Sequence, residues 1–344
     1  MKMRRLIIII LLLVIPALLI VGVVIYGRLY TPSVSPVGEE SILYIPEGAS
    51  YEQVMDTLRA NLEIKNIKVL RWVAEKKKYP SLVKPGKYVI SKPLSSNDLI
   101  NILRGGRQMP VRITFNNVRT LNELAGKIGG QIEADSAEIM EFFSDPDNYT
   151  SDGFSRETVL SVFIPDTYEF YWNTSPRKLY GRMLREYGRF WDKERIKKSE
   201  EIGLSPQEVS TLASIVDEEV TKNDEKPRIA GVYLNRLRQG IPLQADPTVR
   251  FAINNFSVNR ILYKHLETDS PYNTYKYSGL PPGPIACPSK SGIDAVLNAE
   301  KHNYLYFAAR PDFSGYHNFA ATLSEHNKNA RLYQRELNRR RIYR

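Results

Sequence analysis

Three acidic residues follow one another in the stretch SIVDEEV, which covers Ser214–Val220. Neighbouring carboxylates repel one another, and this repulsion favours the protonated form of each acid. A carboxylic acid that stays protonated near neutral pH can give its proton to a leaving oxygen, as general-acid cleavage of a glycosidic bond requires. Asp217, Glu218 and Glu219 are therefore candidate residues for acid catalysis.

The helix that carries these acids favours one of them. We expect this helix to begin at Pro206, a residue type that is common at the first helical position. At 100° per residue, Glu219 lies about 20° from Leu212, within the apolar stripe of the helix. Asp217 and Glu218 point away from that stripe. Glu219 is thus the acid predicted to face the protein interior or a cleft lined by the stripe.

A structural interpretation of Glu219 remains open. A second helix is predicted from Pro227 onward, with Asp224 as its cap. This helix carries Arg228 and Arg236, and either arginine is a suitable partner for Glu219 in an ion pair.

The N-terminal segment has the sequence of a membrane anchor. No charged residue occurs from Leu6 to Tyr26, and such a run is long enough to cross the roughly 30 Å apolar core of a bilayer. A cleaved signal peptide is the alternative, but the run is longer than usual and lacks a small-residue cleavage site. We predict a transmembrane helix over residues 6–26. Basic residues before it place residues 1–5 in the cytoplasm and the remainder outside.

Charge and composition limit the ligands and cofactors that the chain is expected to bind. The chain has 344 residues and a net charge of +10, which in an exported domain suits anionic lipids or an anionic wall polymer better than nucleic acid. Cys287 is the only cysteine, so it is expected to be a buried thiol, and no intramolecular disulfide can form. The histidines lack the spacing of metal ligands, so neither a metal nor a cofactor is expected. They are His265, His302, His317 and His326.

The pattern of strands and helices predicts an α+β protein of two domains after the transmembrane helix. Residues 27–40 are rich in Pro, Ser and Val and are predicted to form a linker. Residues 41–108 contain short strand–turn–helix units that resemble LysM modules, which bind glycans, although a plain α+β spacer domain fits the same pattern. Residues 109–344 are predicted to form a larger mixed α+β domain, which includes one long helix over residues 178–202.

A proline-rich loop in this larger domain suits the wall of a polar groove. It reads SPYNTYKYSGLPPGPIACPS and combines amide, hydroxyl and aromatic groups on a rigid backbone. Together with other motifs it closely resembles the MltG (YceG-like) family of endolytic murein transglycosylases. The motifs are, in chain order, FIPDTYEF, SIVDEE, GVYLNRL, LQADPTV, SPYNTY, GLPPGPIA, YLYFAA and GYHNF.

The resemblance implies a reaction and a setting. Members of the family cleave the bond between N-acetylmuramic acid and N-acetylglucosamine within nascent peptidoglycan strands, and so end strand elongation. The muramyl C6 hydroxyl attacks in place of water and leaves a 1,6-anhydro end. The implied location is the periplasmic side of the cytoplasmic (inner) membrane of a bacterium. The expected partners are peptidoglycan strands, that membrane and cell-wall synthesis proteins, without nucleic acid.

The family pattern also assigns residues. Its catalytic acid falls on Glu219, the residue that the helix geometry selects. The chain departs from the pattern at Asp217, where the family has Glu, and at Glu218, where a basic residue is frequent. The G-G-H-T-F motif of the family appears as GYHNF and retains His317, which we expect to steady the acid or the transition state.

Further residues are hypothesised to support catalysis by holding the sugar amides and rings. They are Asn235, Gln244, Tyr272, Asn273 and Tyr275. Asp246 is expected to cap or brace the Gln244 loop, although Asp166 and Asp246 would be the candidates if a second carboxylate were needed. Two alternatives remain: a lysozyme-type muramidase that uses water, and a non-catalytic membrane protein that binds peptidoglycan.

Overall fold

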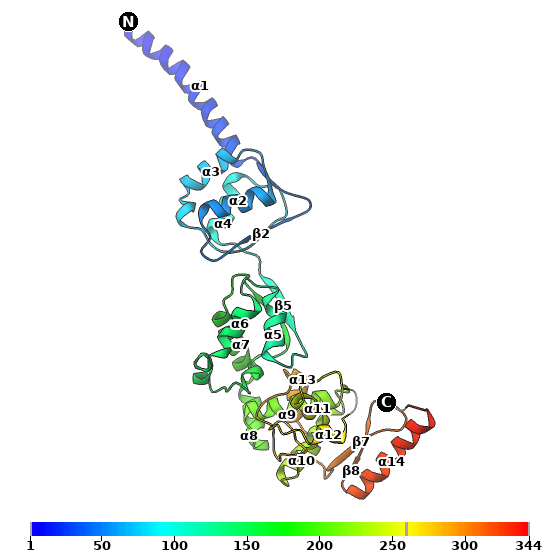
Figure 1. Cartoon of the computed structure of the whole chain (residues 1–344). Helices are drawn as coiled ribbons and strands as arrows, with labels where there is room; N and C mark the ends of the chain where they lie inside the picture. Colours follow the sequence, from blue (N-terminus) through cyan, green and yellow to red (C-terminus); the bar gives the residue numbers. More distant parts are fainter. Residues whose placement is uncertain (1, 259–260, 343–344) are drawn as a thin grey trace. The chain divides into compact units, whose positions relative to one another are not determined.

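The computed structural model describes residues 2–258 and 261–342, and the chain divides into two compact units. The first unit comprises Met1–Arg112 with the short segments Gln131–Ala134 and Glu169–Thr174, and the second comprises the rest. Within the described residues the strands form four two-stranded sheets among many helices, which confirms a mixed α+β protein (Figure 1).

The first unit alternates short strands with helices. Its elements are α1 (Lys2–Tyr30), β1 (Val34–Pro36), β2 (Ser41–Ile45), α2 (Tyr51–Asn61), β3 (Leu62–Ile64), α3 (Ile67–Lys76), the 3₁₀ turn η1 (Tyr79–Ser81), β4 (Gly86–Ile90) and α4 (Ser96–Gly105). Strand β1 pairs with β3 and β2 with β4, both antiparallel. Helix α2 packs on β2 and α3 on α4 (Figure 1).

Local sequence signals account for the helix ends in this unit. Ser50 forms a capping box with Gln53 at the start of α2, and this cap satisfies backbone N–H groups that have no partner inside the helix. Helix α4 is followed by the capping residue Gly106, whose φ of +65° is a left-handed conformation that glycine adopts without steric cost. Between these ends, the helices bury an apolar face that includes Leu58 and Leu99.

Residues 27–40 differ from the predicted linker. Val34 is fully buried, and it lies in β1, which pairs with β3. Burial of this one side chain and the pairing of β1 with β3 hold residues 34–36 against the first unit, while residues 37–40 are exposed. The sequence prediction missed this because three residues are too short for an alternating pattern. Whether residues 41–108 form a LysM-like module stays a prediction.

Helix α1 covers the segment that was predicted to cross a membrane. Side chains of residues 1–11 lie outside the described part, and this includes the predicted cytoplasmic N-terminus, residues 1–5. In the part of the chain that is described, no helix has both the length and the apolar character that crossing a membrane requires. The transmembrane helix predicted for residues 6–26 is therefore not confirmed.

The remaining elements begin with a two-stranded sheet formed by β5 (Val111–Phe115) and β6 (Asp166–Phe170). The helices are α5 (Leu121–Gly129), α6 (Ser136–Ser144), α7 (Pro176–Phe190), α8 (Lys193–Ile202), α9 (Pro206–Glu219), α10 (Lys226–Arg238), α11 (Asp246–Ala252), α12 (Tyr263–Leu266), α13 (Lys290–Leu297) and α14 (Leu323–Arg339). Short 3₁₀ turns lie at η2 (Pro146–Asn148), η3 (Thr150–Asp152) and η4 (Val159–Val162). The final hairpin joins β7 (Tyr306–Ala309) to β8 (His317–Ala320).

Helix α9 is the central helix of the second unit. Its start is fixed by a capping box between Ser205 and Glu208, with Pro206 in the first turn, as predicted. Every residue from Val209 to Val216 is buried, because α10, α11 and α13 all pack against α9. A helix that is buried on all sides is typical of a protein core, and this one ends at Glu219.

The long helix predicted over residues 178–202 is instead two helices, α7 and α8. The chain leaves the helical conformation at Trp191, and the Asp192 side chain caps α8 by accepting a hydrogen bond from Arg195 N. Trp191 is buried beside Tyr187. Burying the indole therefore turns the chain at this point. The spacing of charged and apolar residues in the segment did not indicate this turn.

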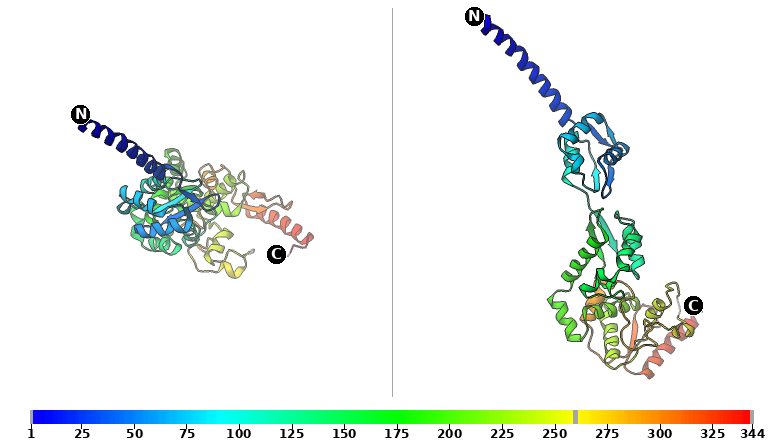
Figure 2. Two further views of the ribbon diagram at one scale, coloured as in Figure 1. Left: turned by 90° about the horizontal axis from the view of Figure 1, so that it is seen from above. Right: turned by 60° about the vertical axis from the view of Figure 1, so that its left-hand side comes forward.

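The C-terminal part of the second unit is a hairpin covered by a helix. Strands β7 and β8 pair antiparallel, and α14 lies along them (Figures 1 and 2). The strand predicted in NYLYFAAR exists as β7, but its residues are half-buried, since a two-stranded sheet with one covering helix leaves part of each strand open.

Candidate active site

The three acids of SIVDEEV, which are Asp217, Glu218 and Glu219, form the last turn of α9. Carboxylates are unfavourable there, because the carboxyl end of a helix carries a partial negative charge and because the acids repel one another. The structure relieves this strain differently for each acid. Two of them form ion pairs with cationic side chains, and the third forms none with any residue that the structure describes.

Asp217 holds the second unit together. Its carboxylate forms a 2.8 Å ion pair with Lys226 Nζ and accepts hydrogen bonds from Ser289 N at 2.6 Å and Ser289 Oγ at 3.0 Å. Helix α13 passes so close that a Cβ added at Gly292 would lie 2.4 Å from Asp217 Oδ1. Asp217 thus joins α9 to α10 and α13.

Glu218 is paired with an arginine. Arg119 Nη2 lies 3.2 Å from Glu218 Oε1, and the guanidinium also stacks on the ring of Phe256 at 4.9 Å. Together with Arg250, these residues line a small cleft. The negative charge of Glu218 is therefore largely balanced.

Glu219 has no cationic partner in an ion pair among the described residues. Its Oε1 accepts a 2.8 Å hydrogen bond from the hydroxyl of Tyr233, which is buried in α10. The pKa of Glu219 is raised from 4.5 to about 7, mainly by burial and in part by the negative charges of Asp246 and Glu218. The Tyr233 hydrogen bond and Arg250 act in the opposite direction. Glu219 therefore remains partly protonated at neutral pH, as a general acid requires.

The two arginines considered as partners for Glu219 bind elsewhere. Arg228 pairs with Glu300. Arg236 is buried and donates to the backbone oxygens of Leu305, Pro242 and Leu243. The helical wheel did not supply the whole reason for selecting Glu219, because α9 is buried on every side from Val209 to Val216. What distinguishes Glu219 from the two neighbouring acids is that it forms no ion pair with any described residue.

Asp246 braces the loop that faces Glu219. Its Oδ1 accepts a 2.7 Å hydrogen bond from the hydroxyl of Tyr275, which ties α11 to the proline-rich loop. Burial and this bond to a carboxylate raise the pKa of Tyr275. Gln244 N donates to Thr274 O at 3.0 Å and strengthens the same connection. Asp246, Gln244 and Tyr275 are thus brought together near Glu219. Asp166 instead forms an ion pair with Lys290.

Three of the hypothesised support residues make contacts within the protein. Asn273 is fully buried, and its side-chain amide donates to Leu266 O and Thr268 O within its own loop. Asn235 donates to His302 O at 2.7 Å and to Tyr304 O at 3.1 Å. Tyr272 packs against Phe251 with ring centroids 4.6 Å apart. These contacts fix the loops around the site.

His317 pairs with a different acid from the one expected. Its Nδ1 lies 2.7 Å from Glu225 Oε2, and its backbone N donates to Glu225 Oε1. Glu225 is almost wholly buried and precedes the first residue of α10. Asp224 was predicted to cap this helix, but its side chain accepts a bond from the Tyr316 hydroxyl. The hairpin thereby holds the connection between α9 and α10.

A cavity of about 310 Å³ shares one residue with the surroundings of Glu219. That residue is Tyr233, which lines the cavity and whose hydroxyl bonds to Glu219. The other lining residues are Arg236, Leu243, Gln244, Tyr275, Leu305, Tyr306, Phe307, Leu323 and His326. This volume is at the lower end of the range for small-molecule sites.

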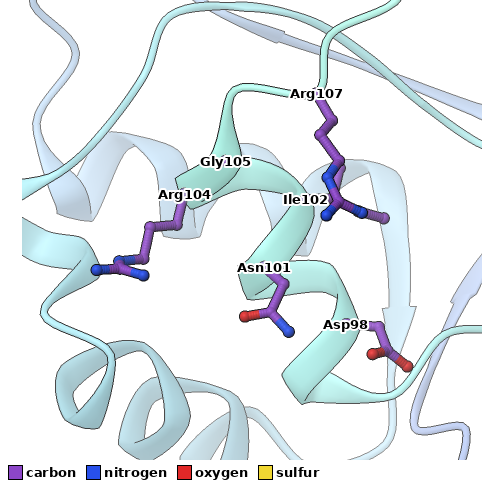
Figure 3. A pocket seen from close by; sticks show the side chains of 6 residues that line it. All are labelled: Asp98, Asn101, Ile102, Arg104, Gly105 and Arg107. Atoms are coloured by element: carbon purple, nitrogen blue, oxygen red, sulfur yellow. The ribbon is translucent and has the colours of Figure 1, made fainter.

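A second hollow, in the first unit, has no comparable chemistry. It measures about 440 Å³ and is lined by α4 and the residues after it (Figure 3). Asp98 and Asn101 already accept bonds from Ser95 and Lys77, and Arg104 and Arg107 extend in different directions. We therefore place the candidate active site at Glu219.

Tyr233 and His326 were not recognised as site residues in the sequence. Tyr233 lies on the buried face of α10, and nothing in the spacing showed that its hydroxyl meets Glu219. Cys287 is buried, as predicted, and burial raises the pKa of its thiol. Within residues 2–258 and 261–342, no cluster of His, Cys, Asp or Glu side chains is arranged to hold a metal ion.

The environment of Glu219 predicts its pH dependence. Because the protonated form donates the proton, kcat/KM is expected to fall as pH rises through about 7. Tyr233→Phe removes a bond that favours the ionised form, so the fall should move to higher pH. Asp246→Asn removes a negative charge and should move the fall in kcat/KM to lower pH. The shift in either variant is expected to be on the order of one pH unit. Profiles of kcat/KM for the three proteins between about pH 5 and 9 test this, and shifts in the same direction would contradict it.

Comparison with known proteins identifies the class to which this chain belongs. The sequence matches the YceG-like family over residues 43–332, and the chain belongs to that family. The endolytic murein transglycosylase of Bacillus subtilis (strain 168) is 31% identical over 335 residues, which cover 92% of this chain and 91% of that protein. The protein of the same name from Streptococcus pneumoniae is 28% identical, with 80% of this chain and 56% of that protein covered.

A solved structure agrees with this assignment. The crystal structure of a yceG-like protein from Listeria monocytogenes has a TM-score of 0.56 and 29% identity to this chain. The match covers 85% of this chain and 99% of that one.

Proposed function

We propose that this protein is an endolytic peptidoglycan lytic transglycosylase and that Glu219 is its catalytic acid. The names of its relatives support the reaction class. The observation that carries the assignment to Glu219 is its setting: a carboxyl with a pKa of about 7, bonded to Tyr233 and without a cationic partner among the described residues. A structural ion pair would instead hold the acid ionised at neutral pH.

One carboxyl group can serve both halves of the reaction. Protonated Glu219 gives its proton to the bridging oxygen, and the bond between that oxygen and C1 of N-acetylmuramic acid breaks, so that N-acetylglucosamine leaves with a free 4-hydroxyl. The resulting carboxylate then takes the proton of the muramyl C6 hydroxyl, and the oxygen of that hydroxyl forms the new bond to C1. The product is the 1,6-anhydro ring, and Glu219 ends protonated as it began.

Asp246 supports this reaction by its charge. Ionised Asp246 favours protonated Glu219, and its negative charge also favours the positive charge that develops at C1. A lysozyme-type hydrolase would need this second carboxylate as a nucleophile or as a base for water. However, Asp246 Oδ1 is held by the Tyr275 hydroxyl, which suits a fixed charge.

Mass spectrometry of digested peptidoglycan tests the proposed reaction. The purified protein is expected to release glycan fragments with 1,6-anhydromuramyl ends from uncross-linked strands. Reducing muramyl ends without anhydro product would identify a hydrolase, and intact strands would identify a non-catalytic binding protein. An assay with strands labelled at one terminus checks the endolytic cut, since internal cleavage shortens the labelled chains to many lengths at once.

We also propose that the second unit acts outside the cytoplasmic membrane, at nascent strands, and thereby ends their elongation. The uncharged run over residues 6–26 and the basic residues before it support a single anchor of this orientation. Sedimentation of the full chain with cell membranes, compared with a chain that lacks residues 1–28, tests the anchor. Recovery of both in the soluble fraction would contradict it.

A further inference from the structure

A small cleft lies beside the last turn of α9, on the side of Glu218. Its walls include Arg119, Glu218, Arg250, Phe251 and Phe256. The enclosed volume is about 20 Å³, and about 10–15 Å³ is enough for one water molecule. The cleft therefore has room for one small polar group, such as a carboxylate, and none for a sugar ring.

The charged side chains of this cleft leave one positive charge in excess. Glu218 balances Arg119, because the two form an ion pair. The side chain of Arg250, on α11, forms neither an ion pair nor a hydrogen bond with any residue that the structure describes. Asp246 lies one helical turn before it, but its Oδ1 accepts a bond from the hydroxyl of Tyr275 instead. The Arg250 guanidinium is thus the group of the cleft that can bind an anion.

Two donor atoms of Arg250 are accessible. Its Nε is buried and has no partner among the described residues, whereas Nη1 and Nη2 are not buried and can reach a ligand in the cleft. A carboxylate accepts two parallel hydrogen bonds from a guanidinium, and this bidentate pair is stronger than a bond between neutral groups. The free pair of donors therefore matches a carboxylate in both charge and shape.

The walls of the cleft strengthen binding of a charged group. The rings of Phe251 and Phe256 lie 6.2 Å apart between centroids, and the Arg119 guanidinium lies 4.9 Å from the centre of the Phe256 ring. Apolar rings exclude water, and charges attract one another more strongly where water is excluded. The side chains of Arg119 and Glu218 are 31% and 24% exposed, so the cleft is open to a ligand from outside.

The cleft is close to the acid that is proposed to react. Glu218 precedes Glu219 in the chain, and the positive charge of Arg250 is near enough to lower the pKa of Glu219. In peptidoglycan, the peptide stem is attached through a lactyl group to C3 of N-acetylmuramic acid, and C1 of the same ring is the carbon at which the bond breaks. The lactyl carboxyl is part of an amide bond. The free carboxylates near the reacting ring therefore belong to the stem.

We propose that the cleft at Arg250 binds a free carboxylate of the peptide stem, so that the protein selects glycan strands with charged stems. The inference rests on the proposed function, because that function places N-acetylmuramic acid at Glu219. It extends the function from the sugar chain to the peptide, and it assigns the selection to one guanidinium. A strand whose stems carry no charge leaves Arg250 unpaired and is expected to bind more weakly.

Binding of a matched pair of ligands to the inactive protein tests this. The first ligand is an uncross-linked tetrasaccharide of peptidoglycan that carries its peptide stems. The second is the same tetrasaccharide after its carboxylates have been converted to methylamides. Titration calorimetry with full-length Glu219→Gln is expected to show at least about tenfold tighter binding of the first ligand. Adding Arg250→Gln should reduce this preference to about twofold or less.

A control variant separates the cleft from the general positive charge of the protein. Arg335→Gln removes one positive charge from an exposed position on α14, and it should leave the preference unchanged. An equal loss of preference in Arg335→Gln would show attraction at long range and overturn the site. Thermal unfolding must show that the Arg250→Gln protein is folded; if it is not, Arg250→Met is used in its place.

A separate assay keeps this inference distinct from the proposed function. Equal affinity for the two ligands, or a preference that remains without the Arg250 guanidinium, overturns the stem site. Anhydro product from the wild type in that case leaves the proposed function intact. A preference that depends on Arg250, without anhydro product from the wild type, supports the stem site and contradicts the function alone.

Discussion

Glu219→Gln is expected to lower the rate of anhydro-product formation at least about 100-fold, because a general acid typically contributes that much or more. The amide has nearly the same shape, and its oxygen can still accept the bond from Tyr233. It cannot give up a proton, so leaving-group departure and activation of the C6 hydroxyl both fail. Rates measured by mass spectrometry on wild type and variant, at equal protein concentration, provide the result.

Glu218→Gln is the matched comparison for this variant. The two acids are adjacent and identical in type, but Glu218 is paired with Arg119. Its replacement is expected to change the rate less than about tenfold, mainly through the small influence of its charge on the pKa of Glu219. Equal losses in the two variants, or retention of activity in Glu219→Gln, would contradict the assignment of the catalytic acid.

Stability separates a catalytic from a structural role for Glu219. The pKa of Glu219 is about 7 in the folded protein and 4.5 is its ordinary value, so the folded state favours the protonated form. Between these values the unfolded chain loses its proton first, and the free energy of unfolding falls as pH rises. Glu219→Gln removes this penalty. The variant is expected to be more stable than wild type at pH 8, by up to about 3 kcal/mol, with no gain at pH 4. A large loss of stability at both pH values would indicate a structural acid instead.

How much of this site can be read from the sequence depends on how local each feature is. The start of α9 follows from Ser205, Pro206 and Glu208, which lie within four positions and interact through the backbone. The position of Glu219 at the end of that helix follows as well. That Glu219 forms no ion pair within residues 2–258 and 261–342 does not follow, because Arg228 and Arg236 bond to other segments, which spacing alone does not place.

Tertiary packing decides the features that the sequence did not reveal. Tyr233 reaches Glu219 because α10 packs on α9, and a tyrosine on an apolar helix face looks the same whether or not its hydroxyl has such a partner. His326 was considered only as a metal ligand. Asn273 has the composition of a sugar contact but is used to fold its own loop. The break at Trp191 likewise reflects burial of one large ring.

Asp217→Ala is expected to destabilise the protein by about 3–5 kcal/mol, because it leaves a buried cation without its partner. The Lys226 side chain is only 8% exposed, and after the substitution its remaining polar contact among the described residues would be Ser291 Oγ at 3.2 Å. Ser289 N, at the start of α13, would lose its acceptor too. Chemical denaturation of wild type and variant measures the difference.

The double variant Asp217→Ala/Lys226→Met tests whether the lost stability comes from the unpaired ammonium group of Lys226 or from lost packing. Replacing both charges removes the stranded ammonium and fills its path with an apolar chain of similar length, so more than half of the lost stability should return. Because Asp217 contacts α10 and α13 and is not hydrogen-bonded to Glu219 or Tyr233, molecules that remain folded should keep a rate within about tenfold of wild type. A single variant that unfolds no more easily than wild type, or a double variant no more stable than the single one, would show that repulsion among the three acids outweighs the pairing of Asp217 with Lys226. In that case the last turn of α9 would be held by the packing of α13 alone.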